Sequence, residues 1–230
     1  MKAVIMAGGK GKRLRPFTYI KPKPLLPVGS INPIEYLIRD IKNSGFDEIL
    51  MSVNYLKNEF NVCIEYSKKY DIQITLIEET KELGTVGSLS LMKEDLDKPF
   101  LMINGDLFVE PPYKQMHLAL ENNKADMVIG ITQKSSVSPY GVVSFDKNNR
   151  LLKIVEKPII KDWINSGVYI LHPRALKSLN NKYMDIHNFI DKIIQNNGTI
   201  ITYDIGNKWL DIGNIDDYEK AIILLESWKD

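Results

Sequence analysis

The segment KAVIMAGGKGKRL at residues 2–14 joins a short apolar run to a loop rich in glycine and lysine. The apolar run from Lys2 to Met6 has the length and composition of a buried strand. The loop continues to Val28, which is long for a compact domain and indicates a functional role. Open α/β sheets bind ligands at the carboxyl ends of their strands, where this loop starts. The segment therefore predicts an α/β fold with a ligand site after the first strand.

Short apolar runs alternate with longer amphipathic runs over at least the first 135 residues. This alternation is typical of βαβ units and a mostly parallel sheet. A helix is expected where Ile34, Leu37, Ile38 and Ile41 fall at helical spacing. Further strands are expected at residues 48–53, 72–77, 100–104 and 127–133, and further helices at residues 56–70, 86–91 and 113–122.

The pattern changes after Tyr140. Residues 141–145 and 151–156 flank a polar turn, which predicts a β-hairpin. A strand at 163–171 and a helix at 186–196 are expected next. Asn214, with Asp217 three residues later, predicts the N-cap of a last helix, whose apolar stripe is Ile215, Tyr218, Ile222 and Leu225. The result is one doubly wound domain with a small excursion.

Composition excludes several classes of protein. Thirty Lys and Arg against 29 Asp and Glu leave a net charge of +1, without the basic field that binds nucleic acid nonspecifically. Cys63 is the one cysteine, so no disulfide forms within the chain, which fits a reducing cytoplasm. His117, His172 and His187 lack zinc-ligand spacing, and no long apolar run predicts a membrane segment. A homo-oligomer stays open, with Trp228 either at its interface or anchoring the last helix.

The loop after the first strand has the composition of an anion site. Three glycines permit tight backbone turns whose N–H groups can bind phosphate, and Lys10, Lys12 and Arg13 supply positive charge. The spacing is neither the dinucleotide-binding nor the P-loop fingerprint, so hydride transfer and ATPase chemistry are not supported. The alternative is an ordinary surface turn.

A second basic segment, KPKPLLPV at residues 21–28, holds two lysines on a proline-stiffened backbone. Together, AGGKGKRL and KPKPLLPVG resemble the signature of the sugar-1-phosphate nucleotidylyltransferases. Further segments match in that family's order: LGTVG at 83–87, INGD at 103–106, YGVV at 140–143, VEKP at 155–158, NSGVY at 165–169 and WLDIG at 209–213. The resemblance spans nearly the whole chain. It implies a Rossmann-like, mostly parallel sheet with a sugar-binding excursion, and transfer of a nucleotidyl group from an NTP to a sugar 1-phosphate with release of pyrophosphate.

Two aspartates follow apolar segments at the expected ligand edge. Asp106 fits either a Mg²⁺ ligand or a helix cap, and Asp211 fits either a second ligand or the cap of the last helix. The resemblance implies that both hold Mg²⁺. It also implies that Arg13 grips the triphosphate and that Lys23 contacts the α-phosphate, which makes Arg13, Lys23 and Asp106 the candidate catalytic residues. The nucleotide would lie against Ala7, Gly8, Gly9, Gly11, Glu79, Gly84 and Thr85.

Glu79 is the informative residue for base choice. A carboxylate only accepts hydrogen bonds, and guanine presents two adjacent donors, whereas uracil and thymine present one donor between two acceptors. Glu79 therefore favours GTP over UTP or dTTP, although the neighbouring Glu78 is an alternative for this position. The turn at Leu83-Gly84-Thr85 also resembles the guanylyltransferase branch of the family.

The sugar phosphate has its own set of candidates. The resemblance implies that Lys157 holds the sugar's phosphate and that Gly141, Glu156, Asn165 and Asp185 contact its hydroxyls. Taken alone, Lys157 fits a solvated lysine and Asp185 fits the N-cap of the next helix.

We therefore expect a single nucleotidyltransferase domain over residues 1–230, with 1–135 mainly binding nucleotide and 136–230 mainly binding sugar phosphate. Lys12 stands where the family usually has Thr or Ser, and hexapeptide repeats are absent. The leading hypothesis is a Mg²⁺-dependent guanylyltransferase making a GDP-heptose, GDP-mannose or GDP-hexosamine for bacterial surface polysaccharide. The alternatives are a UTP- or dTTP-using enzyme, a catalytically silent regulatory subunit of the same fold, and a cytidylyltransferase for a non-sugar phosphate.

Overall fold

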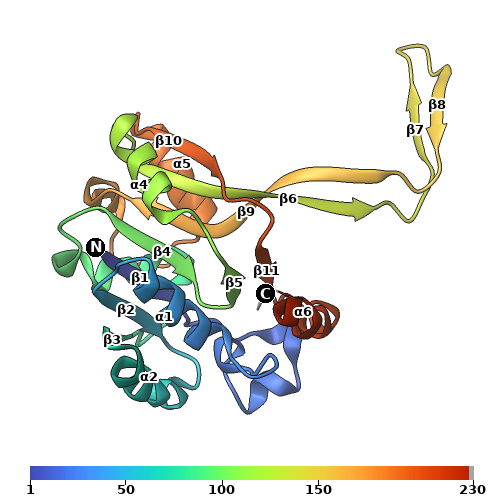
Figure 1. The fold of residues 1–230 in the computed structure, drawn as a ribbon. Coiled ribbons are helices and arrows are strands. Elements are labelled where there is room, and N and C mark those ends of the chain that lie inside the picture. Colours follow the sequence, from blue (N-terminus) through green and yellow to red (C-terminus); the bar gives the residue numbers. More distant parts are fainter. Residues whose placement is uncertain (228–230) are drawn as a thin grey trace.

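The computed structural model describes residues 1–227, in which a seven-stranded sheet lies between two layers of helices (Figure 1). The strand order is β10-β6-β9-β4-β1-β2-β3. All pairs are parallel except those that β9 makes with β4 and β6. The strands are β1 (Lys2–Met6), β2 (Glu48–Val53), β3 (Gln73–Glu78), β4 (Phe100–Asn104), β6 (Met127–Val137), β9 (Ile159–Leu171) and β10 (Ile200–Asp204). The expected α/β fold with a mostly parallel sheet is confirmed.

Side chains alternate along β1, as the strand period requires. Ala3 and Ile5 lie in one core together with residues from α1 (Pro33–Asn43), α2 (Cys63–Tyr70), α4 (Tyr113–Asn122) and α6 (Ile215–Ser227). Val4 lies in the core on the opposite face, with residues from α3 (Gly84–Gly87) and α5 (Ile186–Gln195). Both faces of the sheet are therefore covered, which explains why its strands read as continuous apolar runs.

Helix α1 shows how local sequence sets an element's bounds. Asn32 is its N-cap, and the Asn32 side chain accepts a hydrogen bond from the Glu35 backbone N–H at 2.9 Å. Pro33 occupies the first helical position, where a missing N–H costs nothing. The predicted stripe of Ile34, Leu37, Ile38 and Ile41 is fully buried.

Some elements differ from the sequence expectation. The segment expected as a helix over 56–70 begins as a 3₁₀ helix at Lys57–Val62, and α2 starts only at Cys63. Asn58 and Asn61 are poor helix formers, which favours the tighter turn. Likewise, the helix expected near 86–91 is the short α3 followed by a 3₁₀ turn at Ser88–Leu91, in a segment with two glycines and two serines. Strand β10 and the two short strands described next were not expected.

Two three-residue strands, β5 (Leu107–Val109) and β11 (Trp209–Asp211), form a separate antiparallel pair. Asp211 is the register partner of Leu107, the residue after Asp106. This pairing places residues 209–211 beside the carboxyl end of β4.

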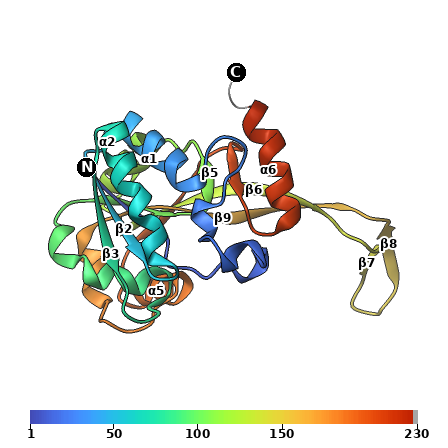
Figure 2. The same ribbon diagram turned by 90° about the horizontal axis from the view of Figure 1, so that it is seen from below.

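Strands β6 and β9 continue past the sheet as a two-stranded ribbon that carries the hairpin of β7 (Val142–Phe145) and β8 (Leu151–Val155) (Figures 1 and 2). The predicted hairpin is confirmed, and both long strands exceed their expected lengths. We call residues 133–163 the arm. The arm points away from the body in both views. Trp228 lies outside the described residues.

Candidate active site

The loop after β1 folds on itself through three 3₁₀ turns, at Lys12–Leu14, Phe17–Tyr19 and Lys23–Leu25. Gly11 has φ +57°, and a Cβ there would lie 2.9 Å from Thr18 Cγ2 and 3.0 Å from Lys23 Cβ. The Thr18 hydroxyl donates to the Gly11 carbonyl at 2.9 Å. A side chain at position 11 would therefore be both strained and crowded. This close packing sets Lys23 beside the glycine-rich turn.

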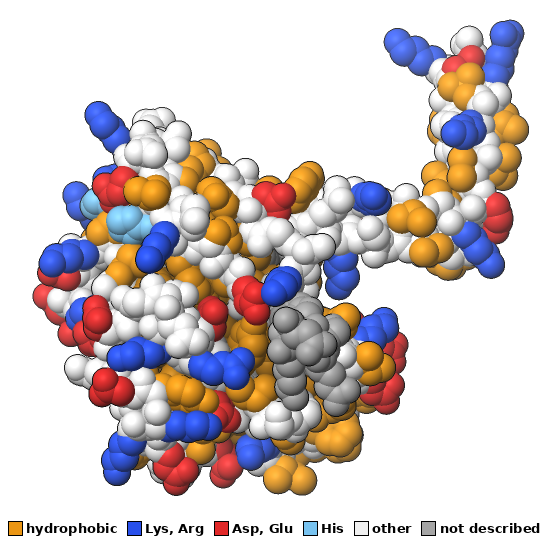
Figure 3. Space-filling view, viewed as in Figure 1, with side chains coloured by type: hydrophobic (Ala, Val, Ile, Leu, Met, Phe, Trp, Pro, Cys, Tyr) orange, Lys and Arg blue, Asp and Glu red, His pale blue; other side chains and the backbone are white. Residues whose placement is uncertain are grey.

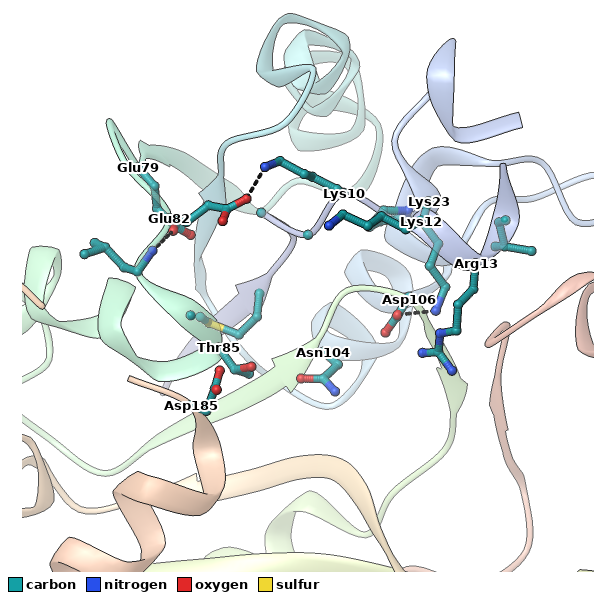
Figure 4. Close-up of a pocket in the computed structure, with 18 of the residues that line it drawn as sticks. Lys10, Lys12, Arg13, Lys23, Glu79, Glu82, Thr85, Asn104, Asp106 and Asp185 are labelled. Atoms are coloured by element: carbon teal, nitrogen blue, oxygen red, sulfur yellow. Dashed lines mark hydrogen bonds and ion pairs between the residues drawn. The ribbon is translucent and has the colours of Figure 1, made fainter. Parts of the chain in front are cut away.

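The loop borders a pocket of about 490 Å³ at the carboxyl ends of β1 and β4 (Figure 4). Most of the candidate nucleotide and catalytic residues line it: Gly8, Gly9, Gly11, Arg13, Lys23, Glu79, Gly84, Thr85 and Asp106. Ala7 is buried directly behind Gly8, with its N–H donating to the Ser52 carbonyl at 2.9 Å. The ligand site predicted after the first strand is thus a formed cavity, whose rim carries Lys10, Lys12 and Arg13.

Three charged side chains meet at one end of the pocket, and we call them the Lys23 cluster. The Lys23 ammonium donates to Asp106 Oδ2 at 2.5 Å and to Asp211 Oδ1 at 3.0 Å. Lys23 is only 7% exposed. Burial alone would lower the pKa of Lys23, but the two carboxylates outweigh burial and raise it. Lys23 is therefore a fixed positive charge in the pocket.

Within the cluster, the environment of Asp211 disfavours the charged form of its carboxyl. Burial and the neighbouring Asp106 carboxylate raise the pKa of Asp211, against the opposing effects of Lys23 and Arg13. Asp211 does not cap the last helix, because the Asn214 side chain accepts from the Asp217 N–H at 2.9 Å instead. The two carboxylates repel each other, so additional positive charge between them is stabilising.

This donor set fits the Mg²⁺ that the resemblance implies. Mg²⁺ prefers oxygen ligands, uses one or two carboxylates and completes its shell with waters and substrate phosphates. Asp106 and Asp211 converge on the same point, occupied by the Lys23 ammonium. No cluster of three or more His, Cys, Asp or Glu side chains suited to a metal occurs among residues 1–227. The two aspartates therefore suit an ion that is completed by a phosphate ligand.

Glu79 lies at the opposite end of the pocket and is 8% exposed. Its Oε1 accepts from the Ser52 hydroxyl, and its Oε2 accepts from the Leu83 N–H at 3.2 Å. A Cβ on Gly8 would lie 2.7 Å from Glu79 Oε1, so only glycine fits beside this carboxylate. By contrast, Glu78 points to the surface and pairs with Lys57 at 2.5 Å. Of the two glutamates, Glu79 is the one that lines the pocket.

The turn that starts α3 packs against the segment before α5. Gly84 has φ +74°, and a Cβ there would lie 2.7 Å from the Met184 carbonyl oxygen. That oxygen accepts from the Val86 and Gly87 N–H groups at 3.0 and 3.2 Å. Asp185 is at the N-cap position of α5, but its side chain makes no capping bond and accepts from the Tyr183 hydroxyl at 3.1 Å. Gly84 thus joins Thr85 and Asp185 into one wall of the pocket.

The structure does not bring the candidate sugar-phosphate residues together. Asp185 lines the pocket, whereas Gly141, Glu156 and Lys157 lie at the hairpin end of the arm. Asn165 is at the base of the arm, where its side chain donates to the Tyr169 hydroxyl at 2.8 Å and accepts from the Gly167 N–H at 3.1 Å. Six residues of strand β9, 159–164, lie between Lys157 and Asn165, and they span roughly 20 Å of extended backbone. One sugar phosphate cannot contact both residues of the same chain.

Sequence reasoning missed Asn104, the last residue of β4. Asn104 lines the pocket beside Asp106, and its Oδ1 is buried without a hydrogen-bond partner among the described residues. A buried amide oxygen without a donor is costly, so this atom is suited to accept from a ligand. The sequence did offer one indication of this role, because Asn104 stands at the carboxyl end of an apolar strand, where open α/β sheets bind ligands. Glu82, which pairs with Lys10 across the mouth of the pocket (Figure 4), carried no such signal.

The fold and this site together describe an α/β domain whose glycine-rich, cationic loop faces a pair of aspartates across a pocket. The sequence pattern of the nucleotidyl transferase family matches residues 2–227, and the chain belongs to that family. The fold is shared with HddC from Yersinia pseudotuberculosis, at TM-score 0.76 and 25% identity over 97% of this chain and 99% of that one. HddC complexed with GMP-PN gives TM-score 0.73 at 26% identity.

Relatives with assigned activities are longer than this chain. The mannose-1-phosphate guanyltransferase of Aspergillus fumigatus is 32% identical over 226 residues, covering 95% of this chain and 62% of the relative. The Saccharomyces cerevisiae enzyme of the same name is 32% identical over 232 residues, covering 97% of this chain and 64% of the relative. The chain thus spans less than two thirds of the curated relatives that it matches. None of the helices described in residues 1–227 has the length and apolar character to span a membrane.

Proposed function

We propose that this protein transfers a guanylyl group from GTP to a sugar 1-phosphate, giving a GDP-sugar and pyrophosphate. The observation that carries the proposal is the Lys23 cluster, because it puts one buried cation and two carboxylates beside a cationic glycine loop. Phosphoryl-type transfer needs positioning and charge stabilisation more than proton transfer, and these residues supply both. The family and the names of the relatives support the same reaction class.

In the proposed reaction, an oxygen of the sugar phosphate attacks the α-phosphorus of the nucleotide, and the bond from that phosphorus to the β-phosphate bridging oxygen breaks. Arg13 and Lys12 would hold the leaving pyrophosphate, because both line the pocket on the glycine-rich loop. Lys23 would contact the α-phosphate as a fixed positive charge. Asp106 and Asp211 would hold Mg²⁺, which when bound neutralises charge on the reacting phosphates.

The preference for guanine rests on Glu79. Its two oxygens are oriented by Ser52 and by the Leu83 N–H, and each keeps a lone pair for a further donor. Guanine offers two adjacent donors to such a carboxylate, whereas uracil would meet it with acceptors on both sides. The names of the relatives, together with GMP-PN bound to HddC, favour the same base. Mannose, heptose and hexosamine 1-phosphates are the sugars that we propose as acceptors, in the synthesis of surface polysaccharide in the cytoplasm of a bacterium.

The test is pyrophosphate release by the purified protein with Mg²⁺. GTP, UTP, dTTP, CTP and ATP are each combined with mannose, glucose, glucosamine and heptose 1-phosphates. We expect release with GTP and one of these sugars, and loss of release in EDTA. Preference for UTP or dTTP would keep the reaction class and overturn the assignment of Glu79. No pyrophosphate release with any pair of nucleotide and sugar phosphate would favour a regulatory subunit of this fold.

Asp106→Asn gives the proposal a residue-level check. Removing one carboxylate of the acidic pair should lower kcat at least 100-fold at saturating nucleotide, because a charge-stabilising ligand is lost from the transition state. Asp97→Asn, next to the amino end of β4, is the control and should keep wild-type turnover. Full turnover by Asp106→Asn would contradict the proposed mechanism.

A further inference from the structure

The arm exposes far more apolar surface than a free monomer usually carries. Beyond the pairing of Ile131 with Asn165, strands β6 and β9 pair, within residues 1–227, only with each other. The hairpin of β7 and β8 has no other partner strand in this part of the chain. Isolated two-stranded ribbons are at best marginally stable in water. Eleven apolar side chains of the arm are each at least 42% exposed: Val137, Tyr140, Val142, Val143, Phe145, Leu151, Leu152, Ile154, Ile159, Ile160 and Trp163.

These side chains together leave on the order of 1,000 Å² of apolar surface in solvent. The largest apolar patch of a typical monomer is roughly 300–600 Å², and each partner in a standard interface buries roughly 800 Å². The space-filling view shows apolar side chains along the projecting arm, which stands clear of the body (Figure 3). The arm therefore has enough surface for a stable interface.

The same hairpin carries three of the candidate sugar-phosphate residues. Gly141 and Glu156 face each other across it, since a Cβ on Gly141 would lie 2.9 Å from Glu156 Oε2. Lys157 follows at the next position with φ +44°. The pocket of the body contains the nucleotide half, with Lys23 and Asp106, but none of these three hairpin residues lines it. Each chain thus has a nucleotide pocket on its body and candidate sugar-phosphate residues on its hairpin, and the two are distant from each other in the same chain.

Given the proposed function, on which this step rests, we infer that the arm docks on a second copy of this chain and completes that copy's active site. Glu156 and Lys157 of one copy would face the Lys23 cluster of the other. Two copies related by a two-fold axis would each give one arm and receive one, which doubles the buried area. Folding the arm back onto its own body would instead break the continuous ladder from Ile131 to Val137.

The body has exposed apolar side chains near the pocket, against which the hairpin of a second copy could pack. Phe17, Tyr19 and Ile20, on the loop that follows Arg13, are 51%, 58% and 81% exposed. Tyr183, which lines the pocket, is 59% exposed. We place the incoming hairpin against these side chains, because Tyr183 lines the pocket and the other three lie on the loop that borders it. The two surfaces match in chemical character.

Complementation between two inactive variants tests the inference. Asp106→Asn removes the function of a pocket, and Lys157→Ala removes the function of an arm, so each alone should lose at least tenfold in turnover. In a 1:1 mixture after reassembly, half of the dimers contain one intact pocket facing one intact arm. The mixture should therefore recover about a quarter of wild-type activity. No recovery, or full activity of Lys157→Ala alone, would overturn the inference.

A second readout does not depend on activity. Light scattering should give twice the 26.4 kDa chain mass. One chain carrying Ser144→Cys on the hairpin and a differently tagged chain carrying Glu82→Cys at the pocket mouth should cross-link to each other through a bis-maleimide, since the native Cys63 is buried. Lys98→Cys, near the amino ends of the strands, replaces Glu82→Cys in the control and should not react with the hairpin.

These results separate the two proposals. A monomer, or a dimer without the Ser144–Glu82 cross-link, overturns the docking of the arm even when the wild type is an active guanylyltransferase. A cross-linked dimer that releases no pyrophosphate with any substrate supports the docking and overturns the proposed function.

Discussion

The buried Lys23 ammonium holds two half-buried carboxylates, Asp106 and Asp211, close together. Replacing Lys23 by Met, which has similar length but no charge, should leave Asp106 and Asp211 facing each other without a cation. Breaking a buried ion pair costs about 3–5 kcal/mol, so the melting temperature in EDTA should fall by roughly 6–20 °C. Mg²⁺ should restore more stability to Lys23→Met than to the wild type, because the variant's acidic pair binds it without competition. Thermal unfolding with and without Mg²⁺ measures both effects.

The control for this prediction is Lys21→Met, two residues earlier on the same loop and exposed. That variant should melt within about a degree of the wild type, since surface substitutions away from buried partners have small effects. Equal melting temperatures for Lys23→Met and Lys21→Met would show that the cluster contributes nothing to stability.

Glu79 makes a second residue-scale prediction. Glu79→Gln replaces one accepting oxygen by a donating amide, so it should meet the guanine donors with a donor of its own. We expect kcat/KM for GTP to fall 10- to 100-fold, and the ratio of GTP to UTP turnover to fall with it, since a charge-assisted bond contributes about 1.5–3 kcal/mol. Glu78→Gln, which alters only the surface pair with Lys57, should keep the wild-type ratio. A loss of stability with an unchanged ratio would assign Glu79 a structural role only.

Among the elements of the fold, helix α6 connects two segments of the candidate active site. Its N-cap, Asn214, follows directly on the segment that carries Asp211, and its Tyr218 stacks on Phe17 with ring centroids 6.3 Å apart. The Tyr218 hydroxyl also donates to the Pro27 carbonyl. The helix therefore fastens the loop after β1 to the β11 segment, and the stability of the helix should affect both.

Asn214→Ala tests this at the helix terminus. Losing the side-chain acceptor for the Asp217 N–H should lower the unfolding free energy by about 1 kcal/mol. Asn214→Ser, which keeps an accepting oxygen, should retain most of that stability. Urea unfolding of the three proteins measures the difference, and equal midpoints for Ala and Ser at this position would rule out the cap.

At the scale of the whole molecule, a buried carboxyl makes stability depend on pH. Burial raises the pKa of Asp40 to about 6 from an ordinary value of 3.8, with Glu110 adding to the rise and Tyr113 and Arg39 opposing it. The Tyr113 hydroxyl donates to Asp40 Oδ2 at 2.7 Å. A raised pKa means that the folded state holds the proton more tightly than the unfolded state. The resulting stability is present below about pH 4 and lost as the pH rises through 6.

Asp40→Asn should remove this dependence and keep an acceptor for Tyr113. Its unfolding free energy should match that of the wild type near pH 4 and exceed it by on the order of 2 kcal/mol at pH 7. Denaturant unfolding at several pH values gives the comparison. Asp71→Asn, a fully exposed control, should follow the wild type throughout. A constant difference between Asp40→Asn and the wild type from pH 4 to 7 would contradict the assignment.

The fold class and the nucleotide half of the candidate site follow from the amino-acid sequence alone. The strand from Lys2 to Met6, the helix with Ile34 and the glycine-rich loop follow from local periodicity and from residue types, which are encoded over short stretches of chain. Because parallel strands end at one edge of the sheet, the loops that follow them meet there, and the nucleotide candidates from Gly8 to Thr85 line a single pocket.

The pairings between distant segments become visible only in the folded chain. Strands of three residues, such as β5 and β11, are too short to show a period, yet their register brings Asp211 to Lys23. The free oxygen of Asn104 depends on what surrounds it. The length of β9 places Lys157 far from the pocket of its own chain. Long-range pairing and distance are properties of the packed chain, so local sequence patterns do not contain them.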